Sequence, residues 1–158
     1  MDANLQYVDG MFKTNTDLVT KCLTGIPAEQ WGLKPGDSSN HLLWVMGHLV
    51  WARGLVLKTL GADVSLHWAP QFARGAKCEG VEQYPKVEEV CSAWTDFSTR
   101  LATCLAEVPA EVLAKPHDKP TFDGKVGGFV AFLAFHEAYH VGQVSYLSKW
   151  LGHGQLIG

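Results

Sequence analysis

Two histidines late in the chain have the spacing of a metal-binding pair. His136 and His140 lie four residues apart in an apolar stretch, so on a helix they share one face, about one turn apart. Phe129, Leu133 and Val144 fall on the same face, which predicts that the pair faces a core. Buried imidazoles need partners. A divalent metal ion would satisfy both rings at once, and hydrogen bonds to core groups are the alternative.

A third histidine strengthens the metal interpretation. His48 lies in a second apolar helical segment, on one face with Val45, Ala52 and Leu55. Three histidines from two helices would supply three nitrogen ligands and leave a position for water or substrate, as catalytic metal sites do, whereas structural zinc is closed by four protein ligands. A helical bundle whose histidines bond only to each other and to the core, without metal, remains the structural alternative.

Composition restricts the class of protein. The chain has 158 residues, of which 47% are hydrophobic and 18% charged, which predicts one globular domain over residues 1–158. The net charge of −3 and the lack of a basic block argue against nucleic acid as a partner. The first residues lack signal-peptide features, and the longest apolar stretch is too short to span a bilayer, so we expect a soluble cytoplasmic protein without a membrane partner. The four cysteines form no C-x-x-C pair and are expected to be reduced and mostly buried.

Hydrophobic periodicity predicts four helices and no strands, over residues 3–23, 40–60, 85–107 and 126–151. Ser38 and Ser39 provide a plausible N-cap for the second helix. Four amphipathic helices predict an all-α fold, a four-helix bundle with long irregular connections between helices two and three and between helices three and four. The first of these, residues 62–83, contains His67, Trp68 and Phe72 and is expected to pack over the bundle. Covering the metal site is one role open to it.

Residues 136–140 also match H-E-x-x-H, the zinc-peptidase pattern in which the Glu is a general base. The residues after His140 contain no Asp or Glu and a single histidine, His153, and the longer metzincin pattern fails at Gln143 and Tyr146. A peptidase is therefore not expected. Glu137 points about 100° away from its histidine neighbour on a helix, and we interpret it as a solvated or packing residue in preference to a general base.

Two segments together resemble a known family. They are LKPG at residues 33–36 leading into WVMGHL at 44–49, and FHEAYHVGQVSYL at 135–147. The chain resembles the DinB/YfiT-like superfamily over nearly its whole length. The resemblance implies a four-helix bundle with one histidine on the second helix and an H-x-x-x-H pair on the fourth, and it makes His48, His136 and His140 the metal ligands. It also implies zinc or nickel as the metal, and a homodimer.

The resemblance suggests thiol-dependent chemistry. Some members are thiol S-transferases, so the function expected here is a metal-dependent transferase that joins a low-molecular-weight thiol to a small-molecule substrate. No catalytic residue is assigned. Gln143, Trp51, Tyr139 and His67 are candidates to support the ligands or line the pocket, although the two aromatics also fit a core role. The alternatives are a metal-binding or stress-response protein without turnover and, ranked lower, a metal-dependent hydrolase.

Overall fold

The computed structural model describes residues 5–119 and 121–153. Within these residues there are five α-helices, three short 3-10 helices and no β-strand. The α-helices are α1 (Gln6–Leu23), α2 (Leu42–Thr59), α3 (Val87–Glu107), α4 (Ala110–Leu113) and α5 (Val126–Trp150), and the 3-10 helices are η2 (Ala28–Gln30), η3 (Ala69–Phe72) and η4 (Val81–Gln83).

The all-α prediction is confirmed, and α1, α2, α3 and α5 are the four helices that periodicity predicted. The predicted ends agree closely with the observed ones, except that the expected start at residue 3 lies outside the described residues. The single turn of α4 and the three 3-10 helices were not predicted, because elements this short carry no hydrophobic period.

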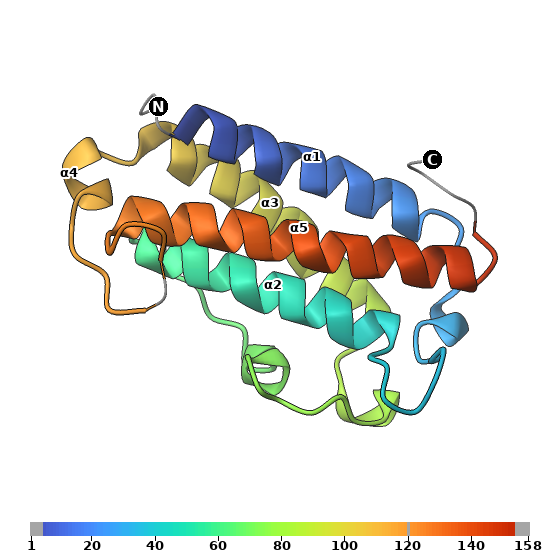
Figure 1. Cartoon of the computed structure of the whole chain (residues 1–158). Coiled ribbons are helices and arrows are strands. Elements are labelled where there is room, and N and C mark those ends of the chain that lie inside the picture. The colour runs from blue at the N-terminus through green and yellow to red at the C-terminus, as the bar shows by residue number, and fades with distance from the viewer. Residues whose placement is uncertain (1–4, 120, 154–158) are drawn as a thin grey trace.

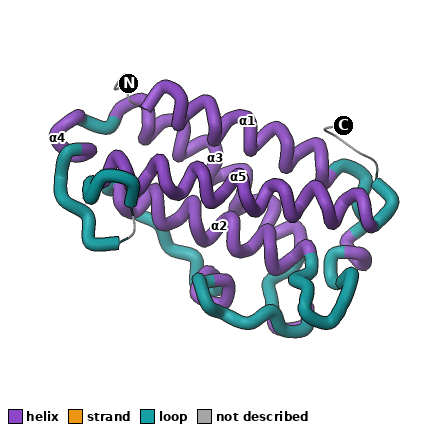
Figure 2. The backbone as a smooth tube through the Cα atoms, viewed as in Figure 1, coloured by secondary structure: helices purple, strands orange, loops and turns teal. Residues whose placement is uncertain are grey.

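The four long helices form a bundle in which α1 runs parallel to α5, and α2 runs parallel to α3 (Figure 1). The hydroxyl of Ser148, near the end of α5, donates to the carbonyl of Cys22, near the end of α1, at 2.9 Å. Because α2 and α3 run the same way, the chain must return along the bundle between them. The 18 residues of α2 span about 27 Å, which is why this connection is long (Figure 2).

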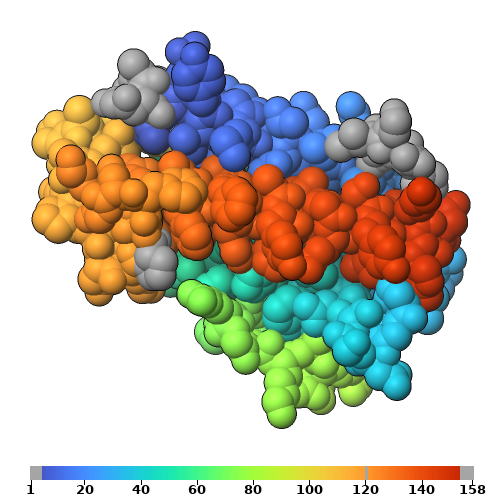
Figure 3. All heavy atoms as spheres, viewed as in Figure 1, coloured from blue at the N-terminus to red at the C-terminus, as the bar shows by residue number. Residues whose placement is uncertain are grey.

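The helices differ in how much of their surface is covered. α1 and α3 bury one stripe each, whereas α2 is covered by α3, α5 and the long connection. Nearly every α2 residue from Leu42 to Leu57 is therefore buried. α5 lies between α1 and α2 and keeps one face open to solvent (Figure 3). The exposed aromatic residues of α5 are Phe135, Tyr139, Tyr146 and Trp150.

The start of α2 is capped by a histidine and not by the predicted serines. The Nδ1 atom of His41 accepts the backbone N–H of Trp44 at 3.0 Å, and its Nε2 atom donates to the carbonyl of Glu79 at the same distance. His41 is fully buried, and burial lowers its pKa, so it stays neutral and can act as donor and acceptor together. It ties the start of α2 to the long connection, a role that the sequence did not indicate.

A buried ion pair crosses the centre of the bundle. Arg53 of α2 and Glu137 of α5 are each 1% exposed. The guanidinium donates from Nε to one carboxylate oxygen of Glu137 at 2.7 Å and from Nη2 to the other at 2.8 Å. The expectation that Glu137 is solvated is therefore wrong, whereas the packing alternative is closer to what the structure has.

Arg53 also reaches the two remaining helices. Its Nη2 atom donates to the Thr16 hydroxyl at 2.8 Å and to the Phe12 carbonyl at 3.3 Å, both on α1. Its Nη1 atom donates to the hydroxyl of Ser98 on α3, and its Cζ atom lies 3.6 Å from the centre of the Trp94 ring. One side chain thus links its own helix to the other three long helices, and each of its three nitrogens donates at least one hydrogen bond.

No helix in the described part of the chain is both long and apolar enough to cross a membrane. The homodimer expected from the family resemblance stays a prediction, as does the extent of the domain.

Substitution of Glu137 by glutamine tests the ion pair. E137Q leaves a buried guanidinium without its counter-charge, and we expect it to lower the free energy of unfolding by about 3–5 kcal/mol, measured by urea denaturation. The matched control is D96N, which removes the carboxylate of the solvent-exposed pair between Arg100 and Asp96 and should cost less than about 1 kcal/mol. Equal, small effects of E137Q and D96N would contradict the central role of the pair.

Candidate metal centre

Three histidine rings meet where α2 crosses α5. His48 Nε2 lies 3.2 Å from His136 Nε2, which in turn lies 3.1 Å from His140 Nε2. One nitrogen from each ring falls within 4.8 Å of the others. His48 is 4% exposed and His140 9%, while His136 is more accessible. The three histidines that helical spacing singled out are therefore brought together, and they could hold a metal ion.

Two tryptophans of α2 fix the plane of the His48 ring. Trp44 lies one turn before His48 and Trp51 nearly one turn after it, and the ring centres are 5.1 Å and 5.2 Å from that of His48. Both pairs are stacked, with interplanar angles of 7° and 27°. The two indoles fix the plane of the imidazole, whose Nε2 then points toward His136 on α5 and whose Nδ1 points toward the Phe72 carbonyl.

Hydrogen bonds from Nδ1 decide which ring nitrogen of His48 and of His140 remains free to bind a metal ion. His48 Nδ1 lies 2.6 Å from the Phe72 carbonyl oxygen, and His140 Nδ1 lies 2.7 Å from the Gln143 side-chain oxygen. An oxygen of this kind can only accept, so each Nδ1 carries the proton. The Nε2 atoms of His48 and His140 are then unprotonated, and their lone pairs point into the cluster.

This arrangement fits a cation better than it fits hydrogen bonding alone. A neutral His136 has one N–H at Nε2 and can donate it to only one of its two neighbours. The Nε2 lone pair of the other neighbour then faces His136 without receiving a hydrogen bond. The Nδ1 atom of His136 is buried and has no hydrogen-bond partner among the described residues. A metal ion would accept all three lone pairs, and three neutral imidazole nitrogens form the donor set that zinc, nickel and similar ions take.

The electrostatics keep the rings neutral. Burial lowers the pKa of His48 to about 4. The pKa of His136 is also lowered to about 4, mainly by burial and in part by the nearby His140, His48 and Arg74. Burial also lowers the pKa of His140. Because only the neutral imidazole has a free lone pair, all three side chains are ready to bind a metal at neutral pH.

The long connection between α2 and α3 covers one side of the cluster, and it does so through Phe72 and not through His67. The Phe72 ring lies directly over Gly47, where any Cβ atom would overlap it. Trp68 and Tyr84 also contact the ring, at centre distances of 5.6 Å and 4.7 Å. This packing presents the Phe72 carbonyl to His48. His67 is exposed, and the structure gives it no contact with the three histidines.

The other candidate pocket residues are placed beside the cluster. Gln143 orients His140, and Trp51 stacks on His48. Tyr139 lies edge-on to His140 with ring centres 5.1 Å apart and is 63% exposed, so it borders the opening and does not belong to the core. Glu137 points away from the cluster into its ion pair with Arg53 and has no freedom to act as a general base.

The cysteines do not join the site. The four are free thiols, but only Cys22 is buried, so the expectation of mostly buried cysteines is wrong. Burial raises the pKa of Cys22, Cys91 and Cys104, which disfavours the reactive thiolate.

A helical bundle with three converging histidines on its second and last long helices defines a class of metal-binding fold. The family model of the DinB superfamily matches residues 11–144, and the chain belongs to this superfamily. A solved structure described as the conserved protein of locus from Enterococcus faecalis has a similar fold, with a TM-score of 0.75 at 14% identity, covering 98% of this chain and 99% of that one. No curated protein matches the chain.

Metal content tests the cluster directly. After purification without added metal and desalting, we expect about one equivalent of a divalent ion in the wild type, with the metal lost in H48A, H136A and H140A. H67A is the control, since His67 is exposed and should leave the metal content unchanged. A wild type that takes up neither zinc nor nickel, or variants that retain their metal, would contradict the three-histidine site.

Substitution of Gly47 tests the support of His48 by the long connection. G47A should displace the Phe72 ring and with it the carbonyl that orients His48, lowering metal affinity by about 10 to 100-fold, measured by competition with a chelating dye. The matched control is G142A on α5, where an added Cβ atom meets nothing within 4 Å. Unchanged affinity in G47A would show that Phe72 does not orient the ligand.

Proposed function

We propose that this protein is a metal-dependent enzyme that transfers a low-molecular-weight thiol to an electrophilic small molecule, with zinc or nickel held by His48, His136 and His140. The observation that carries the proposal is the convergence of three neutral ring nitrogens from two helices. Three protein ligands leave room for an exogenous ligand. The chemistry that the ion supplies when bound is to keep a coordinated thiol deprotonated near neutral pH.

The residues of this chain then serve to hold and orient. Phe72 and Gln143 keep protons on the outward nitrogens of His48 and His140, and the two stacked tryptophans prevent rotation of the His48 ring. In the transfer, the sulfur forms a bond to the electrophilic carbon, the leaving group departs with its electron pair, and the thiol proton passes to solvent. No protein acid or base is required if the electrophile carries a good leaving group.

The pairing of Glu137 with Arg53 supports transfer and argues against hydrolysis of the zinc-peptidase type. Glu137 is the only acidic residue of α5, the helix that carries two of the three histidines, and Arg53 binds both of its oxygens. A hydrolase of the zinc-peptidase type needs a carboxylate free to accept a proton from water. The four free cysteines are consistent with the reducing cytoplasm in which a low-molecular-weight thiol would be abundant.

The test is a thiol-induced change at the metal. Nickel- or cobalt-loaded wild type is titrated with L-cysteine, and we expect a new thiolate-to-metal absorption band that saturates. Y139A, which alters the opening without removing a ligand, should keep the band, whereas H136A should not form it. Consumption of the thiol in the presence of 1-chloro-2,4-dinitrobenzene then measures transfer.

The alternative is a metal-binding or stress-response protein without turnover. It predicts stoichiometric metal, no thiol band and no catalysed loss of thiol. A protein with that behaviour would contradict the proposed transferase while leaving the metal centre intact.

A further inference from the structure

A small apolar pocket lies beside the metal centre, between α2 and the connection that follows it. Its volume is about 200 Å³, smaller than the pockets that enclose drug-sized ligands. Side chains from both segments form its wall, among them Trp51, Leu55, Lys58, Leu66, Pro70 and Ala73. The pocket is wide enough for a short alkyl chain or a single ring.

Trp51 is common to the pocket and to the metal centre. Its indole stacks on His48 and also lines the pocket. The connection between α2 and α3 also reaches both the pocket and the metal centre, within three consecutive residues. The Phe72 carbonyl holds His48, Ala73 lines the pocket, and Arg74 follows directly in the chain. A molecule in the pocket would therefore contact the same indole that stacks on His48.

The charged side chain that lines the pocket is positive. Lys58 is the only charged residue that lines the pocket, and its side chain is exposed at the rim. Arg74 is exposed as well, and no ion pair with Arg74 occurs in the described part of the chain. An apolar wall with one lining cation and no lining carboxylate complements an amphipathic anion and opposes a cation.

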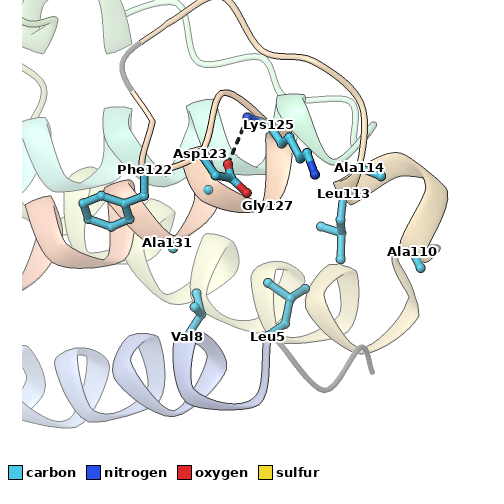
Figure 4. Close-up of a pocket in the computed structure, with 11 residues that line it drawn as sticks. Leu5, Val8, Ala110, Leu113, Ala114, Phe122, Asp123, Lys125, Gly127 and Ala131 are labelled. Atoms are coloured by element: carbon cyan, nitrogen blue, oxygen red, sulfur yellow. Dashed lines mark hydrogen bonds between the residues drawn. The ribbon is translucent and has the colours of Figure 1, made fainter.

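A larger cavity does not share these features. It has a volume of about 510 Å³ and lies where α4 packs against the first turn of α5, with Leu5, Val8 and Leu113 on its wall and both Asp123 and Lys125 at its edge (Figure 4). Unlike Trp51 in the small pocket, none of its lining residues stacks on one of the three histidines or hydrogen-bonds to one. It is therefore not tied to the histidine cluster, and its two opposite charges give no preference for the charge of a ligand.

We propose that the pocket behind Trp51 binds the apolar part of the electrophilic substrate, and that this substrate is a small carboxylate or similar anion whose charge lies near Lys58 or Arg74. The assignment of the occupant as substrate rests on the proposed function. The existence and the charge preference of the pocket do not, because they follow from its lining and its rim.

Binding of unreactive probes tests the pocket without any turnover. Zinc-loaded, ¹⁵N-labelled protein is titrated with hexanoate, hexanol and hexylammonium at constant ionic strength, and the amide resonances of Gly54, Ala69 and Ala73 are followed. We expect saturable shifts at these three amides, with hexanoate binding about 5 to 10-fold more tightly than hexylammonium. K58Q combined with R74Q should reduce the affinity for hexanoate to that for hexanol.

A pocket-filling substitution provides the second arm. L55W places an indole in the pocket and should weaken hexanoate binding at least about tenfold, and L66W does the same from the other wall if L55W folds poorly. The matched control is L18W, which fills a groove between α1 and α5 on another side of the bundle and should leave binding unchanged. Equal affinity for hexanoate and hexylammonium, or hexanoate binding that L55W and L66W both leave intact, would overturn the proposal. Since the readout needs neither thiol nor electrophile, it is independent of the test of transferase activity.

Discussion

The bidentate ion pair between Arg53 and Glu137 is the interaction on which the rest of the structure depends. Apart from the contacts among the three histidines themselves, the helices that carry them, α2 and α5, are joined mainly by apolar contacts, which are not directional. A fork of two parallel hydrogen bonds has one good geometry. It therefore sets the register of α2 against α5, with Arg53 five residues after His48 and Glu137 directly after His136. The bonds from Arg53 to α1 and α3 hold the outer helices in the same register.

The metal centre adds a second layer of positioning to this frame. Helix register brings three imidazoles together, but it does not determine which nitrogen of each ring is protonated. The Phe72 carbonyl and the Gln143 amide make that selection. Gln143 lies on the same helix as His140, whereas Phe72 lies on the connection that packs over Gly47. The protonation state of the site thus depends on residues outside the three-histidine cluster.

Much of this could be predicted from the sequence because the signals are local. Hydrophobic periodicity located the four long helices, and the spacing of His136 and His140 placed both rings on one face. A signal for the ion pair was also present: Arg53 is the only charged residue between Leu42 and Leu57, and Glu137 is the only acid of α5. A lone charge in an apolar helix needs a partner. The partner's identity could not be predicted, because it depends on how the helices are arranged.

Other features have no counterpart in the sequence. A backbone carbonyl is present at every residue, so nothing marks that of Phe72 as the acceptor for His48. His41 resembles any surface histidine until the connection folds over it and buries it. The small pocket beside Trp51 is formed by segments whose contact depends on the same packing. Each of these features arises from the connection between α2 and α3, where residue type alone predicts little.

The parallel arrangement of α2 and α3 also has a consequence for the order of folding. His48 and His136 are separated by 88 residues, and the carbonyl that orients His48 belongs to a crossover that can settle only after α2 has formed. Contacts over such separations close late and slowly. A partly folded chain can offer the His136 and His140 pair on an isolated helix, but not the third ligand. Tight metal capture is therefore a property of the completed bundle, and an ion taken up there would stabilise the native state selectively over its folding intermediates.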